Sequence, residues 1–326
     1  MSYRLLLPSL LALGAAGLAA CDNDTTQPNT VTRSAITETA SHAARSTKGI
    51  SLTRLSTLRG SATAISESGL IVGTLIGANG WDHATVWNRH GAIDLTPALD
   101  GQSHALEVNN KGQIVGFIGW TACCEAVVWQ NGIMEYLDPS HAGSRAYGIN
   151  EAGAIIWNSN RGDWLTVRGQ TTALPGGEPR AINAAGAVAG LGLGNWLWRN
   201  ETVTDLGLLS PTAINATGAV AGVINRPPFE EPGHGHAGVW QRGKLTDLGT
   251  LPGSDFSEAY GINAAGDVVG YGETAGGLDH AILWRRGQII DLGGVSPWST
   301  SHAKSINAAG QIVGDLDDLP VIWTVK

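Results

Sequence analysis

The sequence predicts an all-β fold, a seven-bladed β-propeller of four-stranded antiparallel blades whose ring is closed by an N-terminal strand. Three observations predict it: a seven-fold internal repeat, four short apolar segments in each repeat, and a last repeat without its fourth segment. The chain has 326 residues with 45 glycines and 12 tryptophans, and only 15% of its residues are charged. Glycine turns between short apolar segments fit this composition better than disorder does.

Each repeat begins with the pattern Ala-x-x-Ile-Asn-x-x-Gly-x-Val-x-Gly, which is clearest at residues 259–270. Asn at the first position of a turn and Gly at the fourth predict a type I turn between two strands. A serine replaces the asparagine in the first copy, and the seven positions are Ser66, Asn109, Asn150, Asn183, Asn215, Asn263 and Asn307. The copies recur about every 40 residues, which is the size of a propeller blade. A solenoid, with its shorter period, is the second choice.

The second half of a repeat predicts two further strands. Residues 280–284 read His-Ala-Ile-Leu-Trp, and a glycine turn and a segment ending in Asp291-Leu292 follow. The third segment is apolar at consecutive positions, as expected where neighbouring blades cover both faces of a sheet.

The two ends of the repeat array predict how the ring closes. The seventh copy stops at residues 322–326, after its third strand. Residues 50–58 are similar to the fourth strand of other copies, so we expect them to complete the last blade. Such closure hides two sheet edges.

The segments "GINAAGDVVG", "HAILW" and "TDLGTLPGS" resemble the HAF family of bacterial extracellular repeat proteins. The resemblance covers residues 49–326 and is weakest at 164–167 and 195–198, where the third-strand pattern is incomplete. It implies an exported repeat domain and brings no catalytic residues.

The N-terminus predicts export and a lipid anchor. Residues 1–20 have the charge and the apolar run of a signal peptide, and Leu18-Ala19-Ala20-Cys21 resembles the bacterial lipobox. Cys21 is therefore the expected lipidation site. Residues 21–48 are polar and aperiodic and predict a disordered tether, followed by the propeller domain at 49–326. We expect a membrane-anchored lipoprotein of the bacterial cell envelope, periplasmic or cell-surface.

The charge distribution limits the partners. The net charge is −8 and the chain has no basic cluster, which argues against nucleic-acid binding and against electrostatic docking on anionic lipid. We expect a monomer without a cofactor that meets the membrane only through its lipid.

Candidate ligand-binding residues lie in loops. Trp81, Trp120 and Trp298 fall outside the repeated tryptophan position, and aromatic loop residues could form a platform for glycan or protein. The alternative is that each packs on its own blade. The repeated His83, His236 and His280, and the repeated aspartates after them, predict structural hydrogen bonds, because a catalytic pair is needed only once.

Neither metal binding nor catalysis has a strong motif. His234 and His236 stand in the longest insertion and could ligate zinc, but a solvated loop is the simpler interpretation. The chain has no nucleophile elbow, no phosphate-binding glycine loop and no Cys-x-x-Cys, so no catalytic residue is predicted.

These observations favour a non-enzymatic binding or scaffolding module for protein or glycan. The alternative is an envelope enzyme, such as a glycan lyase or hydrolase, with its site in the propeller funnel. Unrepeated charged residues converging on the axis would favour the enzyme. The sequence offers few charges in the strands near Ile-Asn, which favours binding.

Overall fold

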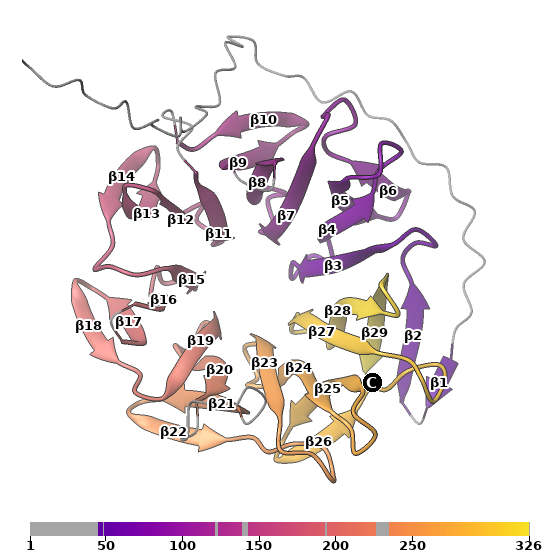
Figure 1. The fold of residues 1–326 in the computed structure, drawn as a ribbon. Helices are drawn as coiled ribbons and strands as arrows, with labels where there is room; N and C mark the ends of the chain where they lie inside the picture. The colour runs from indigo at the N-terminus through magenta and orange to yellow at the C-terminus, as the bar shows by residue number, and fades with distance from the viewer. Residues whose placement is uncertain are drawn as a thin grey trace, which may run out of the picture.

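The computed structural model describes residues 45–47, 49–120, 123–138, 143–192, 194–225 and 235–325. These residues form strands β1 to β29, arranged in seven antiparallel sheets around a central axis (Figure 1). The predicted seven-bladed propeller is therefore confirmed. Within the described part of the chain there is no helix of the length and apolarity that a membrane crossing requires.

In blades 1 to 6 the strands follow one another in chain order from the axis to the rim (Figure 1). Blade 1 contains β3 (Gly60–Ile65), β4 (Ile71–Ile76), β5 (Asp82–Asn88) and β6 (Gly91–Asp94), and blade 2 contains β7 (Gln102–Val108), β8 (Ile114–Trp120), β9 (Cys123–Gln130) and β10 (Ile133–Tyr136). Blade 3 contains β11 (Arg145–Ile149), β12 (Ile155–Ser159), β13 (Gly162–Val167) and β14 (Gln170–Ala173), and blade 4 contains β15 (Pro179–Ile182), β16 (Val188–Gly190), β17 (Trp196–Arg199) and β18 (Thr202–Asp205). Blade 5 contains β19 (Leu209–Ile214), β20 (Val220–Ile224), β21 (His236–Gln241) and β22 (Lys244–Asp247), and blade 6 contains β23 (Ser257–Ile262), β24 (Val268–Glu273), β25 (Asp279–Arg285) and β26 (Gln288–Asp291).

Blade 7 joins the two ends of the propeller. It contains β27 (Ser301–Ile306), β28 (Gln311–Leu316) and β29 (Leu319–Val325), followed outward by β2 (Ile50–Arg54) and β1 (Arg45–Thr47). The predicted closing strand is confirmed, because β2 pairs antiparallel with β29 from Ile50↔Val325 to Arg54↔Val321. Strand β1 lies inside segment 21–48, which the composition assigned to the tether. Its pairing with β2 is made by backbone groups, which polar residues supply as well as apolar ones.

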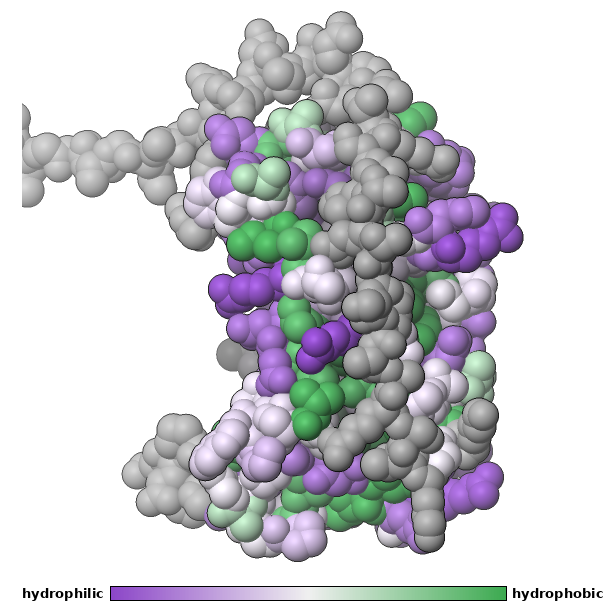
Figure 2. Space-filling view, turned by 90° about the vertical axis from the view of Figure 1, so that its right-hand side faces the viewer, coloured by the Kyte–Doolittle hydropathy of each residue, from purple (hydrophilic) through white to green (hydrophobic). Residues whose placement is uncertain are grey.

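Connections alternate between two faces of the ring. The turn that begins with Asn263 joins the first strand of blade 6 to the second, and the equivalent turns of all blades lie on one face, the Asn-turn face. The connections from second to third strands and from blade to blade lie on the other, the long-loop face. Hydrophobic residues run through the middle of the rim, and hydrophilic ones gather toward the two faces (Figure 2).

The repeated Asn holds each turn and links it to the next blade. Asn150 Oδ1 accepts hydrogen bonds from the backbone N–H groups of Ala152 (3.0 Å) and Ala154 (2.9 Å). Its Nδ2 donates to the carbonyl of Asn183 in blade 4 (3.1 Å). Equivalent amide-to-carbonyl links start from all six repeated asparagines, and the last reaches the carbonyl of Ser66 in blade 1.

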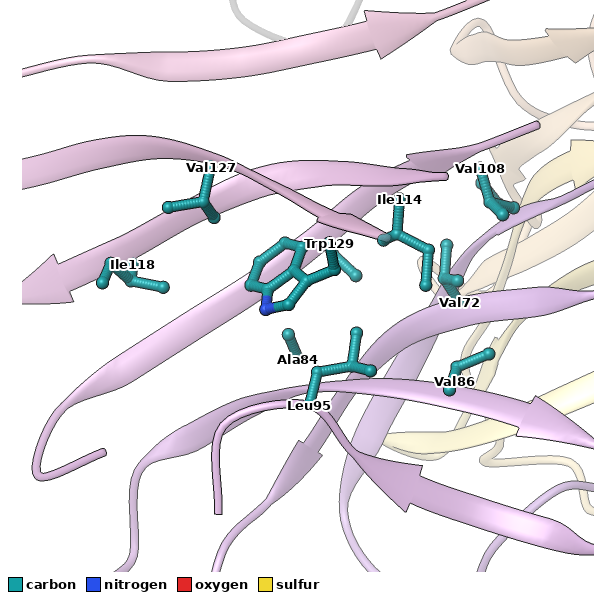
Figure 3. Close-up of a cluster of buried hydrophobic side chains, with 11 residues drawn as sticks. Val72, Ala84, Val86, Leu95, Val108, Ile114, Ile118, Val127 and Trp129 are labelled. Atoms are coloured by element: carbon teal, nitrogen blue, oxygen red, sulfur yellow. The ribbon is translucent and has the colours of Figure 1, made fainter. Parts of the chain in front are cut away.

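The apolar core lies between adjacent blades. Trp129 of blade 2 is 2% exposed and packs against Ala84 and Leu95 of blade 1 (Figure 3). Trp284 packs on blade 5 in the same way, and Trp323 on blade 6. In the blades that contain it, the repeated tryptophan therefore fixes the blade to the preceding one.

Candidate functional site

The inner strand of every blade contains a β-bulge, and the bulged residue points to the axis. In β23 the register shifts between Ala259 and Gly261, which leaves Tyr260 unpaired. The last glycine of the repeat permits this, because a Cβ on Gly270 would overlap the carbonyl oxygen of Glu258. Bulges re-aim side chains. The seven bulged residues all line one axial cavity: Thr63, Leu106, Tyr147, Arg180, Thr212, Tyr260 and Lys304.

Two overlapping cavities occupy the axis. The first, of about 250 Å³, is lined by the bulged residues. The second, of about 470 Å³, shares five of them and extends toward the long-loop face past Ser210 and Glu258, with Leu191, Pro211 and Val223 as its apolar wall. The shared residues are Tyr147, Arg180, Thr212, Tyr260 and Lys304. We call the two cavities together the funnel.

Blades 6 and 7 place a connected group of titratable side chains at the funnel. Glu258 Oε2 accepts hydrogen bonds from the hydroxyls of Tyr271 (3.1 Å) and Tyr260 (3.4 Å). The rings of Tyr260 and Tyr271 stack at 5.5 Å, and Tyr271 meets the ring of His302 edge-on at 4.8 Å. Burial raises the pKa of Glu258 and raises that of Tyr271 to about 12, so both tyrosine hydroxyls stay protonated near neutral pH.

His302 and Lys304 share one carboxylate. His302 Nδ1 lies 2.8 Å from Asp315 Oδ2, and Lys304 Nζ lies 2.8 Å from Asp315 Oδ1. Lys304 also donates to Ser61 Oγ at 2.8 Å. The hydrogen bond to Asp315 raises the pKa of His302. Burial alone would raise the pKa of Asp315, but the bond from His302 and the charge of Lys304 lower it to about 2.

The opposite side of the funnel carries a second charged group. Arg180 Nη2 pairs with Glu178 Oε2 at 3.1 Å, and its guanidinium lies 5.9 Å from the centre of the Tyr147 ring. Arg180 Nε is buried and has no hydrogen-bond partner within the ranges that the structure describes. Glu107 lines the narrower cavity and accepts the backbone N–H of Val108 at 3.0 Å, and burial raises its pKa to about 7.

The predicted tryptophans stand in or next to connections on the long-loop face and are not among the residues that line the funnel. Trp298 is 84% exposed in the connection from β26 to β27, and Trp81 is half-buried between β4 and β5. Trp120 ends β8, and its side chain lies outside the described residues. The Trp platform stays a prediction.

The repeated His and Asp form the same pair in three blades, as the structural interpretation expects. The distances are 2.7 Å for His83–Asp94 and 3.0 Å for both His236–Asp247 and His280–Asp291. Asp94 also accepts the backbone N–H of Thr96, so the pair fixes the turn that leaves the blade.

The remaining predicted sites are only partly described. His236 is engaged with Asp247, whereas His234 and Cys21 lie outside the described residues. No group of three His, Cys, Asp or Glu side chains suited to a metal ion occurs in the described ranges. The metal and lipidation sites stay predictions.

The funnel residues were not predicted from the sequence. The strands near Ile-Asn were expected to contain few charges, yet these strands bring Arg180, Lys304 and Glu107 to the axis. The signal was present at the two variable positions of Ala-x-x-Ile-Asn. The backbone of this pattern recurs in every blade, while the bulged residue differs in size and charge around the ring.

Comparison with known proteins supports the fold alone. No protein-family model matches the chain, and no curated protein matches its sequence. The chain is similar to the structure of virginiamycin B lyase from Staphylococcus aureus, with a TM-score of 0.59 and 14% identity over 85% of this chain and 99% of that one. For a streptogramin B lyase structure the TM-score is 0.59 and the identity 14%, over 85% of this chain and 97% of that one. For a catalytically inactive variant of the staphylococcal lyase with quinupristin the TM-score is 0.56 and the identity 14%, over 85% of this chain and 99% of that one.

Proposed function

We propose that this protein is a lipoprotein of the bacterial cell envelope, anchored through Cys21, whose propeller binds a glycan or protein ligand in the funnel. The observation that carries the binding role is the ring of seven bulged residues. The blades repeat one backbone, yet the residues that they turn to the axis vary in chemistry, with threonine and tyrosine twice each and leucine, arginine and lysine once each. A purely structural channel has no need of such a mixture, whereas a binding site has.

The signal-peptide pattern and the HAF-family resemblance support the envelope location. Strand β1 lies on the rim of blade 7, where Arg45 pairs with Leu52 in the middle of β2. Metabolic labelling with a fatty acid tests the anchor, because Cys21→Ser would remove the label and release the protein from membranes.

A glycan and envelope-peptide screen tests the binding role, with an occluding variant and two controls. Thr212→Tyr places a large side chain in the funnel, and blades 3 and 6 already hold tyrosine at this position. Val203→Tyr makes a similar change on the rim, where Val203 is 50% exposed. We expect ligands of the wild-type protein to be lost in Thr212→Tyr and kept in Val203→Tyr and Trp298→Ala.

Two results would contradict this proposal. Ligands lost in Trp298→Ala but kept in Thr212→Tyr would move the site to the exposed loops. A screen without any ligand would contradict the binding role.

A second candidate is an enzyme in the same funnel. The linked Glu258, Tyr271 and His302 favour it, because shifted pKa values on neighbouring groups are typical of acid–base sites. Incubating each ligand with the protein and analysing the mixture by mass spectrometry distinguishes the enzyme from the binding module. Turnover that Tyr271→Phe abolishes would establish the enzyme, and intact ligand would support binding alone.

A further inference from the structure

Two cations face the funnel although the protein carries a net charge of −8. Arg180 of blade 4 and Lys304 of blade 7 line both cavities. Their carboxylate partners, Glu178 and Asp315, are not among the residues that line them. The two positive residues therefore line the ligand space, whereas their carboxylate partners do not.

Burial favours the neutral form of the two carboxylates on the funnel wall. Glu107 and Glu258 line one cavity each, and burial raises the pKa of both. Each cation also has N–H donors that its carboxylate partner does not use. A guanidinium has five N–H donors and an ammonium three, which is more than Glu178, Asp315 and Ser61 accept from them. An added carboxylate would accept these hydrogen bonds.

The shape and polarity of the funnel wall indicate what the ligand carries besides its carboxylate. The five residues common to both cavities come from five blades, and each ends in or carries a polar group. A sugar, with hydroxyls around its whole ring, can meet donors and acceptors on all sides. The cavity of about 470 Å³ is of ordinary size for a small-molecule site.

We infer that the funnel binds a carboxylated sugar, with its carboxylate between Arg180 and Lys304 and its hydroxyls against Tyr147, Tyr260 and Glu258. The inference rests on the proposed binding function and names the ligand class for the same site. Because the attraction is electrostatic, the affinity falls as salt concentration rises.

Calorimetric titration of the full chain with four probes tests the inference. The probes are uronic-acid disaccharides, the matching neutral disaccharides, a sulfated disaccharide and a peptide with a free C-terminal carboxylate. We expect the uronates to bind most tightly and to lose about 10- to 100-fold in affinity in Lys304→Met, since a hydrogen bond to a charged group is removed. Lys111→Met removes an exposed lysine on the Asn-turn face and should leave affinity unchanged.

The outcomes separate the ligand class from the binding role. The inference is overturned if the neutral sugar binds as tightly as the uronate, or if the peptide or the sulfated sugar binds more tightly. If Thr212→Tyr abolishes the binding of that other probe, the funnel is still the binding site. Failure of every uronate to bind also overturns it. If Lys304→Met does not fold, Arg180→Met and the salt dependence of the wild-type protein decide the same question.

Discussion

Replacing Asn150 by alanine tests how the repeated asparagine holds the ring together. Asn150 is 6% exposed, and its amide makes three hydrogen bonds: two to its own turn and one to the carbonyl of Asn183 in the next blade. Alanine at this position makes none of them. The turn and the contact between blades 3 and 4 are weakened by the same substitution.

The expected loss in the free energy of unfolding depends on whether each group that loses its hydrogen bond has another partner. Ala152 is exposed, so water replaces the lost acceptor of its N–H. Ala154 is 5% exposed, so its N–H stays unsatisfied at about 1–3 kcal/mol. The carbonyl of Asn183 still accepts the N–H of Gly186 at 2.9 Å, so the lost link between blades costs only about 1 kcal/mol. Together these give about 2–4 kcal/mol.

Urea unfolding measures this difference from the shift in midpoint at a common slope. The chain contains its own reciprocal test. Ser66 Oγ accepts the N–H of Leu70 at 3.0 Å but cannot donate an amide to blade 2. Ser66→Asn should therefore add the missing seventh link and stabilise the protein by about 1 kcal/mol. The reasoning is refuted if Asn150→Ala costs less than about 0.5 kcal/mol, the usual effect of a surface substitution.

Three further predictions concern the core and the funnel. By urea unfolding, Trp284→Phe should cost about 1 kcal/mol more than Trp129→Phe, because Trp284 Nε1 donates to a backbone carbonyl at 3.2 Å whereas Trp129 Nε1 has no partner in the described part of the chain. Equal costs would contradict this. The raised pKa of Glu107 means that the folded state binds its proton more tightly, so wild-type stability should fall as pH rises through about 7, and Glu107→Gln should lack this fall in pH-dependent unfolding. Asp315 has a pKa lowered to about 2, so its contribution is present above its ordinary pKa of 3.8 and lost as pH falls toward 2; Asp315→Asn should also lower the pKa of His302 in an NMR titration, and an unchanged pKa would show that another group holds the proton.

The candidate site shows where sequence reasoning stops. The loop tryptophans were visible because aromatic residues outside a repeat position are conspicuous, and Trp298 is indeed exposed. Arg180 and Lys304 were overlooked because each is a single charge in a strand of small and apolar residues. Their separation along the chain hides that both face one cavity. Only the ring brings them together.

The sequence by itself predicted the blade, a ring of seven blades and the closing strand. Each depends on local chemistry that recurs: an Asn–Gly turn, an apolar third strand, and a fourth strand displaced to the N-terminus. The tertiary structure decided which variable residues share the axis. A β-bulge rotates one side chain per blade inward, and closure places seven such side chains around one cavity. The repeat marks the bulged position in every copy, but the convergence of these side chains on one cavity arises from the bulge and from closing the ring and not from any single repeat.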